Sequence, residues 1–150
     1  MPVYFFDASA LVKRYLREVG NDWLRQLIAA EQPRIFLSSL SGAEVLAAII
    51  RKGRTGEASP EEQQRAVTAF RSEFATSYAL IAPTLAVIHA AMDLIIAHPL
   101  RGYDAVQLAS ALMLPPLPQG AKPLFVAADD GLLRVVERLG LPSDNPNRHP

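Results

Sequence analysis

Short runs of apolar residues alternate along the chain with longer segments in which apolar residues recur at helical spacing. The short runs predict strands at residues 3–6, 33–37, 78–82 and 123–127. The longer segments predict helices at residues 8–16, 21–30, 42–51, 59–76, 83–97, 105–114 and 131–139. The proline-rich stretch 115–120 is expected to be a surface connection, and the tail 142–146 holds one edge strand or none.

This order of elements predicts the fold class. Strands separated by helices of about ten residues or more imply right-handed crossovers and a mainly parallel sheet covered on both faces. The first run, Val-Tyr-Phe-Phe at 3–6, has no polar residue, which favours a strand buried on both faces. We therefore expect a three-layer α/β/α sandwich, and 150 residues with half the composition apolar predict one domain spanning 1–150.

Composition narrows the chemistry. No apolar stretch approaches the ~20 residues that span a bilayer, and the N-terminus does not resemble a secretory signal, so we expect a cytoplasmic protein without a membrane partner. The chain has no cysteine, which excludes thiolate metal sites and cysteine nucleophiles. Its net charge is zero, so only local charge can favour a nucleic-acid partner.

Acidic residues follow the predicted strands at two places. Asp7 comes directly after the run 3–6, and Asp129 follows the run 123–127. The carboxyl ends of parallel strands lie on one edge of a sheet, where ligands bind in open α/β folds. Glu44 lies in the first turn after the second strand, and Asp104 opens a helix after a loop. The four acids can therefore converge on one rim.

Helix capping is the alternative explanation of these acids. Asp7, Asp104, Asp129 and Asp130 all stand where an acid can cap a helix, and residues 41–44 fit a capping box. Capping does not, however, require an acid after two separate strands. Gathered carboxylates repel each other unless a cation or raised pKa values relieve them. Oxygen ligands without cysteine or histidine select Mg²⁺ or Mn²⁺, typical of phosphodiester hydrolysis.

Other chemistries have little support. His89, His98 and His149 are not clustered in the sequence, so none suggests a metal pair. No phosphate-binding glycine motif, dinucleotide fingerprint or serine-hydrolase elbow is present. An aspartyl-phosphate phosphatase would need a second acid two residues after the first, and that position is Ser9.

Four blocks of the sequence resemble the PIN-domain ribonucleases, specifically the VapC toxins of prokaryotic toxin–antitoxin pairs. The blocks match in order and spacing over nearly the whole chain. They are Phe-Asp-Ala-Ser-Ala-Leu-Val-Lys-Arg-Tyr at 6–15, Ser-Ser-Leu-Ser-Gly-Ala-Glu-Val at 38–45, Arg-Gly-Tyr-Asp-Ala-Val-Gln-Leu-Ala at 101–109 and Val-Ala-Ala-Asp at 126–129.

The resemblance implies the roles of individual residues. It makes Asp7, Glu44, Asp104 and Asp129 the catalytic, metal-binding acids, with Ser9 as a supporting hydroxyl. Asp130 could share the role of Asp129, which we prefer because Leu132 then falls at the family's usual apolar position. Ala127 departs from the family, which often has threonine or serine there and so a hydroxyl near the water or metal.

The resemblance also implies an activity and partners. It predicts an Mg²⁺- or Mn²⁺-dependent endoribonuclease that cuts structured RNA such as tRNA or rRNA, or mRNA, leaving phosphate on the 5′ side of the cut. It further predicts a homodimer, inhibited by a VapB-like antitoxin that lays a C-terminal peptide across the site.

Basic residues bracket the predicted site in the sequence. An acidic pocket repels RNA, so phosphates need cations nearby. For Arg51, Lys52 and Arg54 the alternative is a solvated helix end whose dipole favours basic residues. The candidate RNA contacts are Lys13, Arg14, Arg17, Arg51, Lys52, Arg54 and Arg101.

Three further alternatives remain open at this stage. A non-catalytic RNA-binding or scaffold protein would be indicated by loss of acids, and all four are present. A PIN-type nuclease in rRNA maturation, or one acting on structured DNA, would share the site, although the compact length favours the toxin. Finally, the face formed by Trp23, Leu24, Leu27 and Ile28 is either a core stripe or part of a groove for a partner.

Overall fold

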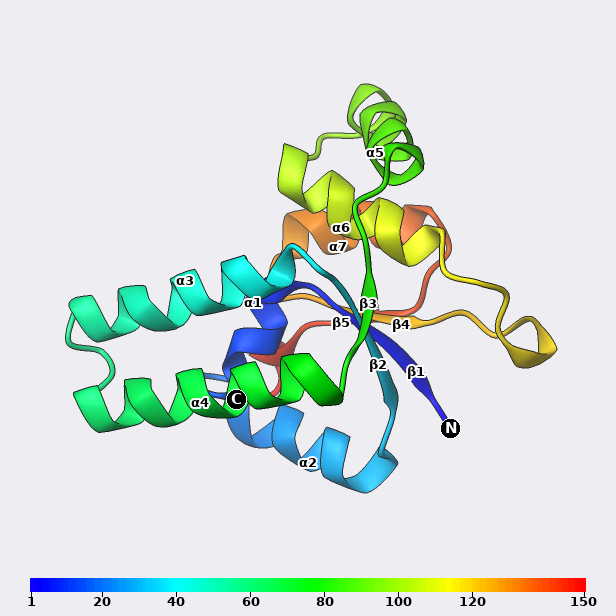
Figure 1. Ribbon diagram of the computed structural model, residues 1–150. Coiled ribbons are helices and arrows are strands. Elements are labelled where there is room, and N and C mark those ends of the chain that lie inside the picture. Colours follow the sequence, from blue (N-terminus) through cyan, green and yellow to red (C-terminus); the bar gives the residue numbers. More distant parts are fainter.

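A five-stranded parallel sheet forms the centre of the computed structural model, which describes all 150 residues (Figure 1). The strand order is β3-β2-β1-β4-β5, and every pairing is parallel. The predicted α/β/α sandwich is confirmed, and the tail adds an edge strand. The strands are β1 (Val3–Phe6), β2 (Arg34–Ser38), β3 (Ala79–Ile81), β4 (Leu124–Val126) and β5 (Ser143–Asp144).

Helices connect successive strands, as the crossover argument predicts. The α-helices are α1 (Ala8–Leu11), α2 (Asn21–Glu31), α3 (Ser41–Arg54), α4 (Pro60–Thr76), α5 (Leu85–Ala97), α6 (Gly102–Leu112) and α7 (Asp130–Arg138). Short 3₁₀ turns are η1 (Val12–Arg14), η2 (Pro118–Gly120) and η3 (Pro146–Arg148).

Alternation along β1 divides the core between the two faces of the sheet. Tyr4 and Phe6 point into the apolar cluster beneath α1, α2, α3 and α4. Phe5 points into the opposite cluster, where α6 and α7 pack, and its ring stacks on Phe125 at a centroid distance of 5.4 Å. Burial on both faces accounts for the unbroken apolar run of this central strand.

The helix predicted at 8–16 is shorter than expected. It ends at Leu11 and tightens into η1. The buried side chain of Asn21 donates a hydrogen bond of 2.6 Å to the carbonyl of Lys13, which satisfies that carbonyl outside a helix. The chain can therefore turn early toward α2.

Helices α5 and α6 form a hairpin on the far side of the second core. Small side chains, Ala91 on α5 with Ala105 and Ala109 on α6, are buried between the two helices and let them approach closely. Neither helix alone is long and apolar enough to cross a membrane, although the pair, bent by 118°, has the length and composition of a broken span.

Candidate active site

One cleft at the carboxyl ends of the central strands brings the four predicted acids together. Its volume is about 460 Å³, and Asp7, Glu44, Asp104 and Asp129 all line it. Asp7 follows β1, Glu44 and Asp104 lie in the first turns of α3 and α6, and Asp129 precedes α7. Residues more than one hundred positions apart thus share a single pocket.

Asp7 is the most buried of the four and is fixed by the sheet. It is 5% exposed, and its backbone N–H donates to the carbonyl of Val126 at 2.9 Å. Its carboxylate accepts from the Ser9 backbone N–H at 3.2 Å, which caps α1, and also from the Ser9 hydroxyl. The same hydroxyl accepts from the N–H of Ala128 at 3.0 Å. Ser9 therefore ties the turn after β1 to the turn after β4.

Burial and mutual repulsion raise the pKa values of two carboxyl groups in this cleft. Burial raises the pKa of Asp7, and the nearby Asp104 and Asp129 carboxylates raise it further, against hydrogen bonds from Ser9. Burial also raises the pKa of Glu44, and Asp7 and Asp104 add to the effect against a hydrogen bond from Gln107. A cation in the cleft would relieve both carboxylates.

Gln107 holds Glu44 in place, a role that sequence reasoning missed. Its side chain is 1% exposed, and Nε2 donates to Oε1 of Glu44 at 3.1 Å and to the Ser41 hydroxyl at 3.0 Å. The Gln107 Oε1 atom is buried without a partner. The sequence signal was its position three residues after Asp104, on the same helical face.

The alternative of a capping box at 41–44 is wrong. The N-cap of α3 is Leu40, which makes no side-chain cap bond, and Ser41 is already the first helical residue. The polar atoms of Ser41 and Glu44 turn to Gln107 instead of the helix end. Capping therefore does not explain Glu44.

Arg101 bridges two of the acids. Its Nε donates to Oδ2 of Asp104 at 3.0 Å, and its terminal nitrogen donates to Oδ2 of Asp129 at 2.8 Å. As they stand, no three acidic or histidine side chains lie close enough together to hold a metal ion. The guanidinium supplies the positive charge between Asp104 and Asp129. The side chain is 78% exposed and keeps N–H donors that these two bonds do not use, so its predicted contact with RNA remains a prediction.

Asp129 and Asp130 point in different directions. Oδ1 of Asp129 caps α7 by accepting from Leu132 N–H at 3.1 Å, and its other oxygen faces the cleft through Arg101. Asp130 accepts from Asn145 at 3.0 Å and from Arg148 at 2.9 Å, and these bonds lower its pKa. Asp130 does not line the cleft. The structure therefore does not bring Asp130 together with the four acids, and Asp129 is the residue of the pair that lines the cleft.

Ala127, the departure from the family pattern, packs into the core. Its side chain is fully buried in the cluster that contains Phe5 and Leu132. The hydroxyl nearest this point is that of Ser9, which reaches the neighbouring Ala128 N–H. A polar group is thus present beside Asp7 without one at position 127.

Several basic side chains that the sequence predicts as RNA contacts form ion pairs within the protein. Lys13 is buried, and its ammonium donates to Glu18 and to the Val19 carbonyl, each at 3.0 Å. These bonds hold the ammonium away from the acidic cleft, which Lys13 does not line. Arg14 pairs with Glu73 at 2.8 Å, and Lys52 pairs with Glu18 at 2.9 Å.

Three of the predicted contacts remain available. Arg17, Arg51 and Arg54 are exposed and form no ion pair or side-chain hydrogen bond. Arg51 also lines the acidic cleft. It is the one cation of this set that faces the cleft and is not already held by a carboxylate.

Comparison with known proteins assigns the chain to a family. The PIN domain model matches residues 4–137, which include all four acids of the cleft. The chain belongs to the PIN domain family. No curated protein matches the sequence.

Solved structures share the PIN fold of this chain at low sequence identity. VapBC2 from Rickettsia felis bound to a DNA fragment from its promoter is 14% identical, with a TM-score of 0.59 over 95% of this chain and 98% of that one. A toxin–antitoxin complex from Klebsiella pneumoniae is 14% identical, with a TM-score of 0.63 over 95% and 97% of the two chains. At this identity the likeness establishes the fold.

Proposed function

We propose that this PIN-domain protein is an Mg²⁺- or Mn²⁺-dependent endoribonuclease that acts as the toxin of a toxin–antitoxin pair in the cytoplasm. The single observation that carries the proposal is the shared cleft, which is lined by four acidic side chains from four separate segments of the chain. An acidic cluster of this kind is costly in the folded protein unless a cation is bound there.

The donor set suits a hard divalent cation. Asp7, Glu44, Asp104 and Asp129 offer only carboxylate oxygens, the ligand type that Mg²⁺ and Mn²⁺ prefer. A cation held there would lower the pKa of a water and neutralise charge on a phosphodiester. For all four carboxylates to face one cation, the ion pairs of Arg101 with Asp104 and Asp129 have to break.

Neighbouring side chains hold two of the four carboxylates in position. Ser9 and the sheet fix Asp7, and Gln107 fixes Glu44, so that two carboxylates need little reorganisation. Arg51 on the cleft wall offers a guanidinium to the RNA backbone, and a released Arg101 offers a second. This combination favours hydrolysis of a phosphodiester in RNA over binding alone.

The partner proposal rests on the family and the fold. Both solved neighbours come from toxin–antitoxin assemblies, one of them named VapBC2. We extend this to a VapB-like antitoxin for the present chain, which inhibits by covering the cleft. A short reading frame beside the gene, encoding a protein that binds this one, is the expected genetic arrangement.

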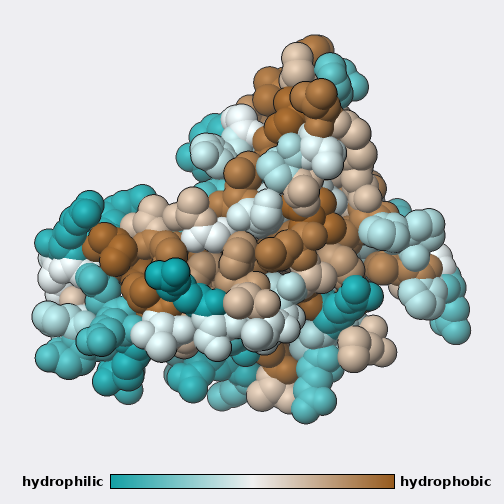
Figure 2. Space-filling model, viewed as in Figure 1, coloured by the Kyte–Doolittle hydropathy of each residue, from teal (hydrophilic) through white to brown (hydrophobic).

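An exposed apolar face supports the proposed homodimer. Leu85 and Ile96 on α5 are 77% and 86% exposed, and Met92 and Tyr103 continue the face beside α6. Figure 2 shows hydrophobic surface gathered over the helical hairpin at the top of the view. Exposed apolar surface of this extent is typical of an interface, and a second copy would cover it.

The nuclease is tested with purified protein and a labelled single-stranded RNA. Cleavage is expected with Mg²⁺ or Mn²⁺, and it should disappear with EDTA and in Asp7→Asn. Glu61→Gln, which neutralises an exposed carboxylate on α4 outside the cleft, is the matched control and should cut at the normal rate. Equal cleavage by the wild type and Asp7→Asn would refute the carboxylate mechanism.

The toxin role needs a separate test in cells. Induced expression of the chain should arrest growth, whereas Asp7→Asn should not. Co-expression of the neighbouring small protein should restore growth. Arrest that persists in Asp7→Asn would separate toxicity from nuclease activity.

A further inference from the structure

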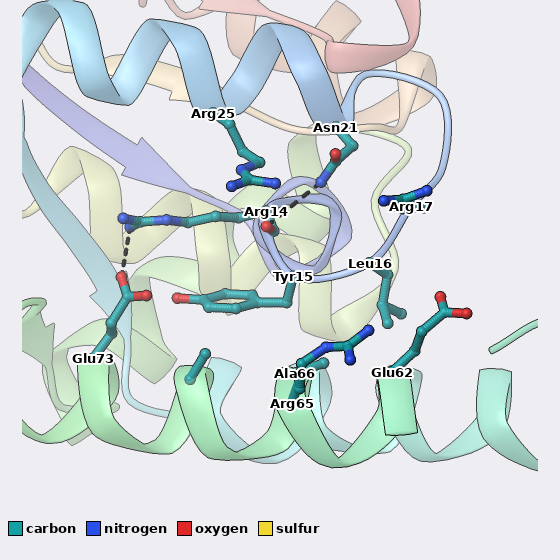
Figure 3. Close-up of a pocket in the computed structure, with 11 residues that line it drawn as sticks. Arg14, Tyr15, Leu16, Arg17, Asn21, Arg25, Glu62, Arg65, Ala66 and Glu73 are labelled. Atoms are coloured by element: carbon teal, nitrogen blue, oxygen red, sulfur yellow. Dashed lines mark hydrogen bonds and ion pairs between the residues drawn. The ribbon is translucent and has the colours of Figure 1, made fainter. Parts of the chain in front are cut away.

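A second hollow lies on the other side of η1 from the acidic cleft. It has a volume of about 420 Å³ and lies between η1, the loop that follows, α2 and α4 (Figure 3). Val12 at the start of η1 lines the acidic cleft, and Arg14 at its end lines this groove. A single residue, Lys13, therefore separates the linings of the two sites in the chain.

Four arginines line this groove, each from a different segment of the chain. Arg14 belongs to η1, Arg17 to the loop after it, Arg25 to α2 and Arg65 to α4. Figure 3 shows the side chains of Arg17, Arg25 and Arg65 directed into the space between α2 and α4. Sequence reasoning named Arg14 and Arg17 but missed Arg25 and Arg65, because only the fold brings α2 opposite α4.

Three of these guanidinium groups have no partner in the protein. Arg14 is held by Glu73 at 2.8 Å and by the Tyr78 hydroxyl at 2.9 Å. Arg17, Arg25 and Arg65 form no ion pair and no side-chain hydrogen bond, and all three are exposed. The donors of these three guanidinium groups are therefore free to pair with an anion that carries several charges.

The floor of the groove argues for a nucleic-acid backbone over a docked peptide. Leu16 and Ala66 are 4% and 3% exposed, so only the half-buried Tyr15 and the small, exposed Ala69 can offer apolar surface to a partner helix. A peptide in a groove depends on apolar anchors, whereas a phosphate backbone needs only cations. The Tyr15 ring, packed edge-on to Phe70 at 5.4 Å, adds a rigid aromatic group to the lining.

The acids of the groove do not cancel this charge. Glu73 is neutralised by Arg14, which leaves Glu62 as the remaining acid of the lining. Three free guanidinium groups therefore face one carboxylate. The balance is cationic, in contrast to the acidic cleft on the other side of η1.

We propose that Arg17, Arg25 and Arg65 bind the phosphates of a single-stranded RNA segment that flanks the bond lying in the acidic cleft. The inference rests on the proposed function for the identity of the ligand. It gives the RNA a cationic track beyond the carboxylates, which by themselves repel it. Guanidinium forks match phosphate oxygens well and carry no base specificity, so the groove contributes affinity without sequence preference.

The test is RNA binding by fluorescence anisotropy in EDTA, where no cleavage competes. The triple variant Arg17→Gln, Arg25→Gln and Arg65→Gln should bind a labelled 12-nucleotide single strand about tenfold or more weakly. Its slope of log affinity against log salt should be shallower by about 2, since each phosphate contact on a single strand contributes about 0.7. Circular dichroism and the thermal midpoint should match the wild type, because the three side chains have no partners to lose.

A matched control removes three exposed arginines outside the groove. The triple variant Arg71→Gln, Arg134→Gln and Arg138→Gln loses the same net charge and should keep most of the RNA affinity. If both triples weaken binding equally, only net charge matters and the proposal fails. If the groove triple keeps its RNA affinity but loses affinity for the antitoxin, the groove is a protein-docking site and the proposal also fails.

RNA binding by the groove and RNA cleavage in the cleft can be tested separately, so the failure of one does not imply the failure of the other. A wild-type chain that binds RNA through the groove but never cuts it would refute the nuclease and leave this inference standing. A groove triple that binds and cuts RNA as well as the wild type would refute this inference alone. Short and long substrates give a second readout, since only RNA that reaches the groove should be cut more slowly by the triple variant.

Discussion

The Nε2 atom of Gln107 lies 3.1 Å from Oε1 of Glu44, and this bond joins α6 to α3 across the wall of the acidic cleft. Because Glu44 is half-buried and its pKa is raised, the amide is one of few groups that favour its charged form. The same amide reaches Ser41, so one side chain sets the geometry of the first turn of α3.

Gln107→Leu should therefore weaken both metal binding and catalysis. Loss of an outer hydrogen bond to a metal ligand typically costs about 10–100-fold in affinity or activity. We expect Mn²⁺ affinity, measured by electron paramagnetic resonance, and the RNA cleavage rate to fall within that range. Gln26→Leu on exposed α2 is the control. An unchanged Mn²⁺ affinity would reduce Gln107 to a packing residue.

Removing Arg101 should have opposite effects on metal and RNA. Its guanidinium pairs with oxygens of Asp104 and Asp129, so a cation that uses these oxygens has to displace it. Arg101→Met should bind Mn²⁺ severalfold more tightly, by titration calorimetry, while RNA affinity falls. Arg148→Met, which loses an exposed pair to Asp130 outside the cleft, is the control. Weaker Mn²⁺ binding in Arg101→Met would mean that the arginine orders the site for the metal.

The raised pKa of Asp7 predicts how stability depends on pH without metal. The folded state binds this proton more tightly than the unfolded state, so its contribution to stability is complete below about pH 4 and is lost as pH rises through the folded pKa. Asp7→Asn stays neutral and removes the loss. Its thermal midpoint in EDTA should exceed that of the wild type by about 3 °C or more at pH 8 and match it at pH 4.

Parallel stability curves for the two proteins between pH 4 and pH 8 would show that Asp7 is not destabilised by its surroundings. Adding Mn²⁺ provides an internal check. The cation should raise the wild-type midpoint most at high pH, where the carboxylates are charged, and should have a smaller effect on Asp7→Asn.

The apolar face of α5 predicts the behaviour of the chain in solution. Ile96→Glu places a charge on a side chain that is 86% exposed, so the folded monomer should tolerate it, whereas a dimer that buries the face should not. Sedimentation should show a dimer for the wild type and a monomer for the variant. Gln64→Glu on exposed α4 is the control. A wild-type monomer, or a dimer that survives Ile96→Glu, would contradict this interface.

Sequence alone predicted the acids well because their positions are set by strand ends. An acid directly after a buried strand, as at Asp7, must lie on the carboxyl edge of a parallel sheet. The ion pair of Lys13 with Glu18 was not predicted, because the neighbouring residues in the sequence do not reveal that this side chain turns inward. Gln107 was missed for a related reason, since its role depends on the distance between two helices that no local pattern encodes.

The central position of β1 in the sheet anchors Asp7. This strand is paired on both sides, with β2 and β4, and Asp7 extends its ladder through a bond to Val126. Asp104 lies instead in the first turn of α6, where the N-cap residue Arg101 makes no side-chain cap bond and Gly102 and Tyr103 are exposed. Amide protons around Asp7 should exchange with solvent only on global unfolding, whereas those of this first turn exchange through local fraying. Heat or denaturant would therefore displace Asp104 from the cleft while the sheet still holds Asp7 in place.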